Sequence, residues 1–252
     1  VPEATQPQCL EMLKAKDYFQ KLNELIGKTG VIGEEMSRLL LYVIASTYKT
    51  NDTLHALVQG SSGSGKTHLI TKVAELMPPE HTIPLTRVTE SSFYNYGENE
   101  LKNKLLIMED LDGLKEEAFL AFRELQSRGE LNSSTSVKNE QGNIQAARKR
   151  VCGPIASLSA TTKGEIYEDN MSRSLVIAVD ESKEQTANII KAQNDRASGN
   201  IDTSQERKTI EFLQHCMRLI RPYEVVNPFA IKYSYRKKPT RSEGSTSFTR
   251  LL

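Results

Sequence analysis

The sequence has no tryptophan, only three cysteines and no long hydrophobic run. The spacing of Cys9, Cys152 and Cys216 fits neither a zinc site nor a disulfide framework. No apolar run approaches the ~18 residues that a membrane-spanning helix needs. Residues 1–7 carry neither the basic start nor the apolar centre of a signal peptide. We therefore expect a cytoplasmic protein with reduced thiols and no structural metal.

An excess of one charge sign is also missing. Lys and Arg number 33 and Asp and Glu number 32, so the net charge is +1 and any contact with nucleic acid must come from a local patch. Residues 231–250 are such a patch, with six basic residues, one acidic residue and a local charge of +5. Hydrophobic residues make up 38% of the 252 residues, which is enough for a core in one or two domains.

Apolar periodicity predicts helices at residues 10–25, where Gly27 ends the pattern, and at residues 34–48, where Met36 belongs to the apolar face. Short apolar strands then alternate with further helices. The expected strands are residues 54–58, 82–88, 104–108, 155–159 and 175–179, and the expected helices are 68–77, 114–125, 182–197 and 204–219.

This alternation is typical of an α/β domain in which helices cover both faces of a parallel sheet. We expect a three-layer fold with a five-stranded parallel sheet in residues 51–182. Residues 1–50 are expected to form an N-terminal helical segment, and residues 183–252 a C-terminal helical region. The polar residues 131–151, with a turn signal at 141–143, are expected to form a β-hairpin.

One motif indicates a specific chemistry, the binding of phosphate groups. Residues 60–67 match the phosphate-binding loop pattern at every required position, with a predicted strand before them and a predicted helix after them. In such a loop successive N–H groups point at phosphate oxygens, and the helix N-terminus adds positive potential. We therefore predict an ATP and Mg²⁺ site formed by Gly60, Ser61, Ser62, Gly63, Ser64, Gly65, Lys66, Thr67 and His68.

Two residues of this loop have specific roles in that prediction. Lys66 reaches the β- and γ-phosphates, and the Thr67 hydroxyl ligates Mg²⁺. A glycine- and serine-rich surface loop would match the letters by chance, but it would not also stand between an apolar strand and a helix.

An acidic motif supplies the partner that such a loop requires on a neighbouring strand. Glu109 and Asp110 directly follow the apolar strand 104–108. We expect Glu109 to hold Mg²⁺ through water and Asp110 to polarise the attacking water. The alternative is an acidic helix start, and we expect Asp112 to be only a helix cap.

These motifs resemble the AAA+ motors of the minichromosome-maintenance helicase group. The resemblance rests on the phosphate loop, on residues 109–112 and on residues 170–177, which read Asn-Met-Ser-Arg-Ser-Leu-Val-Ile. The chain is more closely similar to the C-terminal ATPase part of bacterial and archaeal zinc-finger DNA primases. That similarity runs from about residue 39 to the C-terminus, through Glu130-Leu131, Ser172-Arg173, Asp180-Glu181-Ser182, Glu184-Gln185-Thr186 and residues 225–230.

The resemblance implies further roles. Arg173 would be an arginine finger that reaches the γ-phosphate bound by a neighbouring subunit, and Thr162 or Thr161 would sense that phosphate. A second sensor arginine belongs on a C-terminal lid helix, where Arg250 is the nearest candidate and Arg241 the next. Since the sequence ends inside that partial lid and lacks a zinc-binding primase module, we expect a fragment of a longer protein.

The resemblance also implies a DNA contact at the hairpin of residues 131–151. Lys138 lies near its turn, and Arg148, Lys149 and Arg150 lie at its base. Residues 91–96 contain aromatic side chains that could stack on bases or belong to the core. We expect the contact with DNA to be phosphate-directed, independent of sequence and made with single strands.

Three functions are consistent with these motifs. The first is an AAA+ motor that assembles into a homo-oligomeric ring, a hexamer by resemblance, and works as a DNA helicase beside a primase module or primase protein. The second is a switch or loader ATPase that remodels a protein partner. The third is a nucleotide-binding module with negligible turnover. Stimulation of ATP turnover by single-stranded DNA separates the first two.

Overall fold

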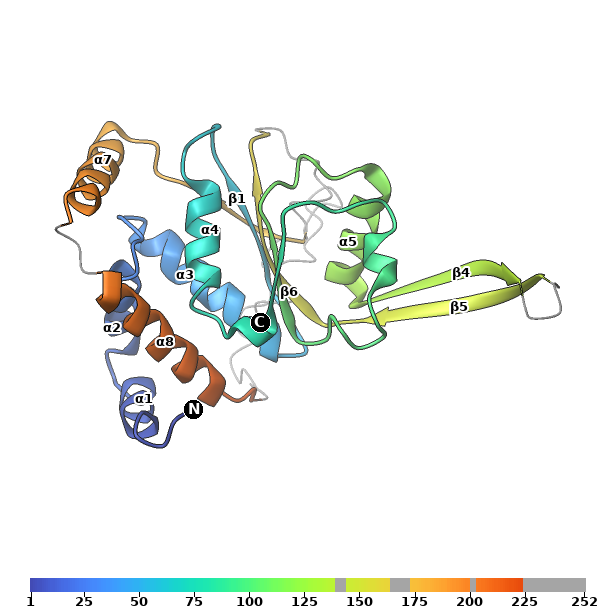
Figure 1. Cartoon of the computed structure of the whole chain (residues 1–252), viewed down its shortest axis with the longest axis horizontal. Coiled ribbons are helices and arrows are strands. Elements are labelled where there is room, and N and C mark those ends of the chain that lie inside the picture. Colours follow the sequence, from blue (N-terminus) through green and yellow to red (C-terminus); the bar gives the residue numbers. More distant parts are fainter. Residues whose placement is uncertain (139–143, 164–172, 200–202, 224–252) are drawn as a thin grey trace, which may run out of the picture.

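The computed structural model describes residues 1–138, 144–163, 173–199 and 203–223. At its centre lies a five-stranded sheet in which every neighbouring pair of strands is parallel (Figure 1). The strand order is β2-β3-β6-β1-β7. The strands are β1 (His55–Gln59), β2 (Thr82–Leu85), β3 (Lys104–Met108), β6 (Ile155–Thr161) and β7 (Leu175–Ala178). The expected five-stranded parallel sheet is confirmed.

The strands are apolar because helices cover both faces of the sheet, as parallel sheets require. All seven residues of β6 are buried. Along β3 the side chains alternate, so that Leu105 and Ile107 join one core cluster while Leu106 and Met108 join the other. The edge strand β2 contains the exposed Pro84, which has no N–H to donate and is tolerated at an edge.

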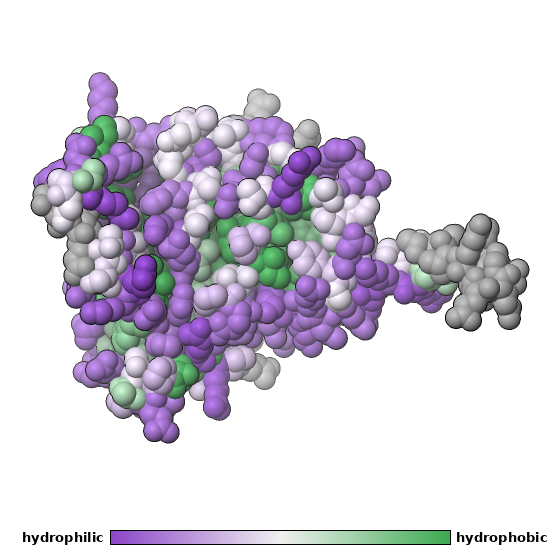
Figure 2. Space-filling view, in the orientation of Figure 1, coloured by the Kyte–Doolittle hydropathy of each residue, from purple (hydrophilic) through white to green (hydrophobic). Residues whose placement is uncertain are grey.

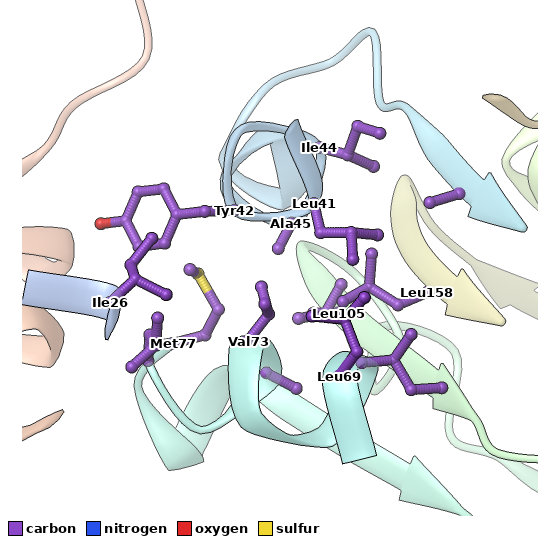
Figure 3. Close-up of a cluster of buried hydrophobic side chains, with 14 of the residues drawn as sticks. Ile26, Leu41, Tyr42, Ile44, Ala45, Leu69, Val73, Met77, Leu105 and Leu158 are labelled. Atoms are coloured by element: carbon purple, nitrogen blue, oxygen red, sulfur yellow. The ribbon is translucent and has the colours of Figure 1, made fainter. Parts of the chain in front are cut away.

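The first core cluster lies between the sheet and the helices α3 (Glu35–Ser46) and α4 (Lys66–Ala74). Figure 3 shows side chains of both helices meeting Leu105 and Leu158 of the sheet. On the other face, α5 (Glu116–Arg128) packs its Phe122 against Phe93, with ring centroids 6.0 Å apart. Burial of one such large side chain contributes about 1.5–3 kcal/mol, so the two clusters hold the three layers together.

The start of the chain differs from the expected single helix at residues 10–25. It forms two helices, α1 (Gln6–Leu13) and α2 (Tyr18–Gly27). The break resets the helical phase, so Leu10 and Phe19, expected on one apolar face, are 43% and 58% exposed. These two placements were therefore wrong.

The buried face of α3 also differs from the prediction, since Met36 is 78% exposed. Arg38 is buried instead, and its guanidinium donates to the backbone carbonyls of Asn23, Val31 and Gly33 and to the Asn23 side chain. These bonds turn α3 so that Met36 faces outward. They also fix the loop before α3 to α2. A short 3-10 turn, η1 (Thr47–Lys49), follows α3.

The expected hairpin is present as a two-stranded antiparallel ribbon that projects from the body of the molecule (Figure 1). Its strands are β4 (Glu130–Lys138) and β5 (Ile144–Cys152), and the predicted turn at residues 141–143 lies outside the described residues. Gly129, at φ 70°, ends α5 in the left-handed conformation and turns the chain into β4. Two further 3-10 turns, η2 (Pro79–His81) and η3 (Ser92–Asn95), flank β2.

The two ends of the described chain meet. After β7 the chain forms α7 (Lys183–Ala197) and α8 (Thr203–Leu219), and α8 packs against α1. Cys9 and Cys216 are both fully buried at this contact. Lys49 caps α8 by donating to the carbonyls of Met217 and Ile220. The basic residues 231–250 lie outside the described part of the chain.

None of the described helices has both the length and the apolar character needed to cross a membrane.

Candidate nucleotide site

The candidate site lies where β1, β6 and β3 end. Gln59, the last residue of β1, pairs with Thr161 of β6, and Met108, the last residue of β3, pairs with Ser159. The phosphate loop, the threonines after β6 and the acidic pair after β3 therefore meet at one edge of the sheet. The acidic strand was expected beside the phosphate-loop strand, and this was wrong, because β6 lies between them.

The phosphate loop has the backbone that its glycines predict. Gly63 and Gly65 have φ of 80° and 91°, which side chains rarely adopt, and a Cβ at either position would meet no atom within 4 Å. The loop is therefore open on this side. Gly65 is the N-cap of α4, so the helix starts at Lys66, two residues earlier than expected, and its free N–H groups belong to the loop.

The loop also has two features of an anion site. Lys66 is only 6% exposed, and its ammonium group donates to the Ser61 carbonyl at 2.5 Å. The Ser64 hydroxyl is buried and lies beside the Glu181 carboxylate, whose pKa it helps to lower. A buried cation and a buried hydroxyl beside a helix N-terminus fit the phosphates of a nucleotide, with Thr67 next in the helix for a metal ion.

The acidic pair has an asymmetric environment. Asp110 Oδ1 accepts from the N–H groups of Asp112 and Gly113 at 3.0 and 3.3 Å, which fixes the orientation of this carboxylate. Its other oxygen has no hydrogen-bond partner within the described part of the chain. The Glu109 carboxylate makes neither a hydrogen bond nor an ion pair with any described residue. Both groups thus have oxygens available to water or a metal ion.

Asp112 is not the helix cap that the sequence predicted, because α5 begins only after Lys115. Its carboxylate instead bridges β3 to β6. Thr161 donates its hydroxyl to Oδ1 at 2.7 Å, and Thr162 donates its N–H and hydroxyl to Oδ2 at 2.7 and 2.8 Å. Partial burial raises the pKa of Asp112, but the three hydrogen bonds outweigh it and hold this pKa below its usual value.

This bridge places the predicted phosphate sensor. Both candidate hydroxyls, Thr161 and Thr162, donate to Asp112, and each keeps acceptor lone pairs. Thr162 is exposed at the sheet edge, whereas Thr161 is 4% exposed. Of the two, Thr162 is therefore the residue that a ligand can reach.

Arg173 lies away from the phosphate loop. It precedes β7, whose first residue Leu175 pairs with Ala56 near the start of β1, whereas the loop follows the end of β1. Arg173 therefore lies at the end of the sheet where the parallel strands begin, opposite the end that carries the phosphate loop. There its Nε donates to the Ser127 hydroxyl at 2.5 Å. The structure does not bring Arg173 together with the other predicted catalytic residues of the same chain.

The ribbon separates the basic residues that the sequence grouped. In the antiparallel register Arg148 and Arg150 share one face and Lys149 lies on the other. Arg150 is paired with Glu130, to which its Nε donates at 3.0 Å, while Arg148 and Lys149 are exposed. Lys138 ends β4, and its side chain lies outside the described residues.

Of the two alternatives for residues 91–96, base stacking or a place in the core, the structure favours the core for Phe93. Phe93 is 1% exposed and stacks on Phe122, and Tyr94 and Tyr96 pack against the same cluster. Base stacking by Phe93 is excluded by this burial.

Three residues at the site were not predicted to act there. Glu181 contacts the phosphate loop through Ser61, Gln185 donates to the Ile32 carbonyl at 2.7 Å, and Glu34 accepts from the Asp180 N–H at 2.6 Å. For Glu181 the sequence offered one indication, because this residue follows a predicted strand that ends at the same side of the sheet as the phosphate loop. His68, which was predicted, is exposed on α4, with Nε2 3.4 Å from the Gly30 carbonyl.

A glycine-rich loop between a buried parallel strand and a helix, with a buried lysine and an acidic pair at the same sheet edge, defines a P-loop NTPase domain. The chain belongs to the MTBMA_p00010 P-loop domain family, whose model matches residues 3–222. No curated protein matches the chain. The matched residues include α1 and α8.

The Asp112 bridge gives a prediction that depends on pH. Because its folded pKa is lowered, Asp112 contributes stability above the unfolded value of about 3.9, and this contribution is lost as the pH falls through the folded pKa. Asp112→Asn should lower the free energy of unfolding at pH 7 by about 1–3 kcal/mol, and by less at about pH 3. Urea denaturation at both pH values measures the difference.

Asp52→Asn, in an exposed turn, is the matched control and should change stability by less than about 0.5 kcal/mol. An Asp112→Asn effect of equal size at both pH values would show that charge on Asp112 is not its cause.

Proposed function

We propose that the protein is an ATP-hydrolysing AAA+ motor that moves on DNA. The observation that carries the ATPase part is the meeting of the open phosphate loop with Glu109 and Asp110 at one sheet edge. ATP and Mg²⁺ fit this site by charge. Lys66 and the α4 N-terminus would hold the phosphates, and Thr67 and Glu109, through water, would hold the metal ion, which supplies charge neutralisation at the phosphates.

The hydrolytic step needs an oriented water. In our proposal Asp110 orients it, because two backbone N–H groups fix one oxygen of this carboxylate and leave the other available. The hydroxyl of Thr162, held by Asp112, would contact the γ-phosphate. His68, exposed on α4 beside Gly30, would also contact the nucleotide.

The DNA part rests on the ribbon and on the resemblance to helicase motors. The ribbon is inserted between the acidic strand and the sensor strand, where the helicase group places its DNA-contacting hairpin. Figure 2 shows hydrophilic side chains where the ribbon leaves the body of the molecule, and such side chains suit phosphates better than an apolar protein partner. By the same resemblance, the subunits would form a hexameric ring that works in replication with a primase.

The second candidate function is a switch or loader ATPase that remodels a protein partner. The observation that favours this function is the composition of β4 and β5, in which Ser, Thr and Ala outnumber the basic residues. Single-stranded DNA should stimulate the ATP turnover of a motor and leave that of a loader unchanged.

The nucleotide site is tested by two substitutions. Lys66→Ala removes the buried positive charge that would face the phosphates. Calorimetry should show that the variant binds ATP about 10-fold to 100-fold more weakly than the wild type. Asp110→Asn should leave ATP affinity within about twofold and stop turnover. Lys72→Ala, on the same helix but outside the loop, is the control.

Equal ATP affinity of Lys66→Ala and wild type would refute the phosphate-loop assignment. If Glu109→Gln alone stopped turnover while Asp110→Asn did not, the two carboxylates would have the reverse roles.

The ring is tested at Arg173. Since Arg173 lies at the opposite sheet edge from its own loop, it can act only on ATP bound by a neighbouring subunit. Arg173→Ala should keep the ATP affinity of the wild type and lose turnover by about 10³-fold or more. Arg128→Ala, an exposed arginine of α5, is the control. A mixture of Arg173→Ala and Lys66→Ala subunits should regain activity, and a mixture that co-assembles but stays inactive contradicts the proposal.

DNA binding is tested at the basic residues of the ribbon. Combined Lys138→Ala, Arg148→Ala and Lys149→Ala should weaken binding of single-stranded DNA and spare basal ATP turnover. Each lost phosphate contact should flatten the slope of log affinity against log salt by about 0.7. Arg150→Ala should have a smaller effect because Glu130 already neutralises it. Lys21→Ala, on α2, is the control, and an unchanged salt slope would exclude the ribbon as the DNA path.

A further inference from the structure

The segment between β7 and α7 touches the phosphate loop. Glu181 Oε1 accepts a hydrogen bond from the Ser61 N–H at 2.5 Å. A Cβ added to Gly60 would lie 2.8 Å from the same carboxylate oxygen and 2.6 Å from Val179, so this glycine permits the close approach. The exposed carboxylate is thus seated against the first residues of the loop.

The charges of the loop favour this contact. The hydrogen bond from the Ser61 backbone lowers the pKa of Glu181, and the positive charge of Lys66 acts in the same direction. The loop and the α4 N-terminus form a region that attracts anions, and Glu181 is an anion supplied by the protein itself. A triphosphate would enter the same positive region and repel this carboxylate.

Glu181 is also tied to α7. The next residue, Ser182, is the N-cap of α7 and accepts from the Gln185 N–H at 3.1 Å. Gln185 is the buried residue of α7 and donates to the Ile32 carbonyl, while the remaining residues of this helix are exposed or half-buried. The first turn of α7 is therefore held directly beside Glu181, while its last turn is held by the ion pair of Arg196 with Glu206 of α8.

We propose that Glu181 competes with the phosphates of the nucleotide for the loop, and that its displacement couples nucleotide binding to α7. The inference rests on the proposed function, since it needs the loop to bind a nucleotide. It assigns Glu181 a regulatory role at that site: the carboxylate lowers nucleotide affinity, and its release loosens the link between the loop and the first turn of α7.

Calorimetry with ATP and with inorganic triphosphate tests the competition. Glu181→Gln removes the charge and keeps the shape, and Glu181→Ala removes both. Competition predicts that the dissociation constants of both ligands fall about threefold to tenfold in Glu181→Gln and at least as far in Glu181→Ala. Glu184→Gln, which makes the same charge change on the exposed first turn of α7, is the matched control and should bind like the wild type.

Hydrogen exchange of residues 183–197 tests the coupling. Saturating ATP should change exchange in the first turn of α7 in the wild type, and this change should be at least halved in Glu181→Ala. A full change in that variant would overturn the coupling.

The affinities also separate failure of the inference from failure of the proposed function. Weaker binding by Glu181→Ala, with wild-type binding by Glu181→Gln, would make Glu181 a residue that holds the loop in shape and would refute competition. Unchanged affinity in both variants would refute it as well. A folded wild-type protein that binds neither ligand would refute the proposed function, and the inference with it.

Discussion

The burial of the central sheet on both faces is the constraint on which the rest of the structure depends. Because β6 has no exposed residue and the central residues of β1 and β3 are apolar, exposed polar groups gather where these strands end. Parallel strands end at the same edge, so this edge receives the phosphate loop, the threonines and the acidic pair together. The chemistry is thus concentrated by the same packing that stabilises the fold.

Within this edge, Asp112 adds side-chain hydrogen bonds between two segments that the backbone also joins, where the Leu111 N–H donates to the Ala160 carbonyl at 2.9 Å. Its three hydrogen bonds from Thr161 and Thr162 hold the end of β6 against the turn that follows β3. This turn also orients Asp110, whose carboxylate accepts a hydrogen bond from the Asp112 N–H. A residue expected only to start a helix therefore links the residues assigned to phosphate sensing and to water orientation.

The sequence predicted the helices and strands better than it predicted which of them lie side by side. Strands such as β3 and the phosphate loop are encoded locally, by an apolar run and by a glycine pattern, and both were found where expected. The position of β6 between β1 and β3 depends on pairing between distant segments, which local periodicity does not contain. The same holds for Glu181, whose partner Ser61 is 120 residues away, and for Met36, which faces outward because of the buried Arg38.

The ribbon turns small movements of the body into large ones. Each of its strands has nine residues, which corresponds to a length of about 30 Å. It is attached at one end only, where Leu131 and Val151 are buried beside α5. A rotation of about 10° at that base would carry the far end through about 5 Å, as a lever of this length requires. The length of the ribbon would therefore amplify any rotation at its base.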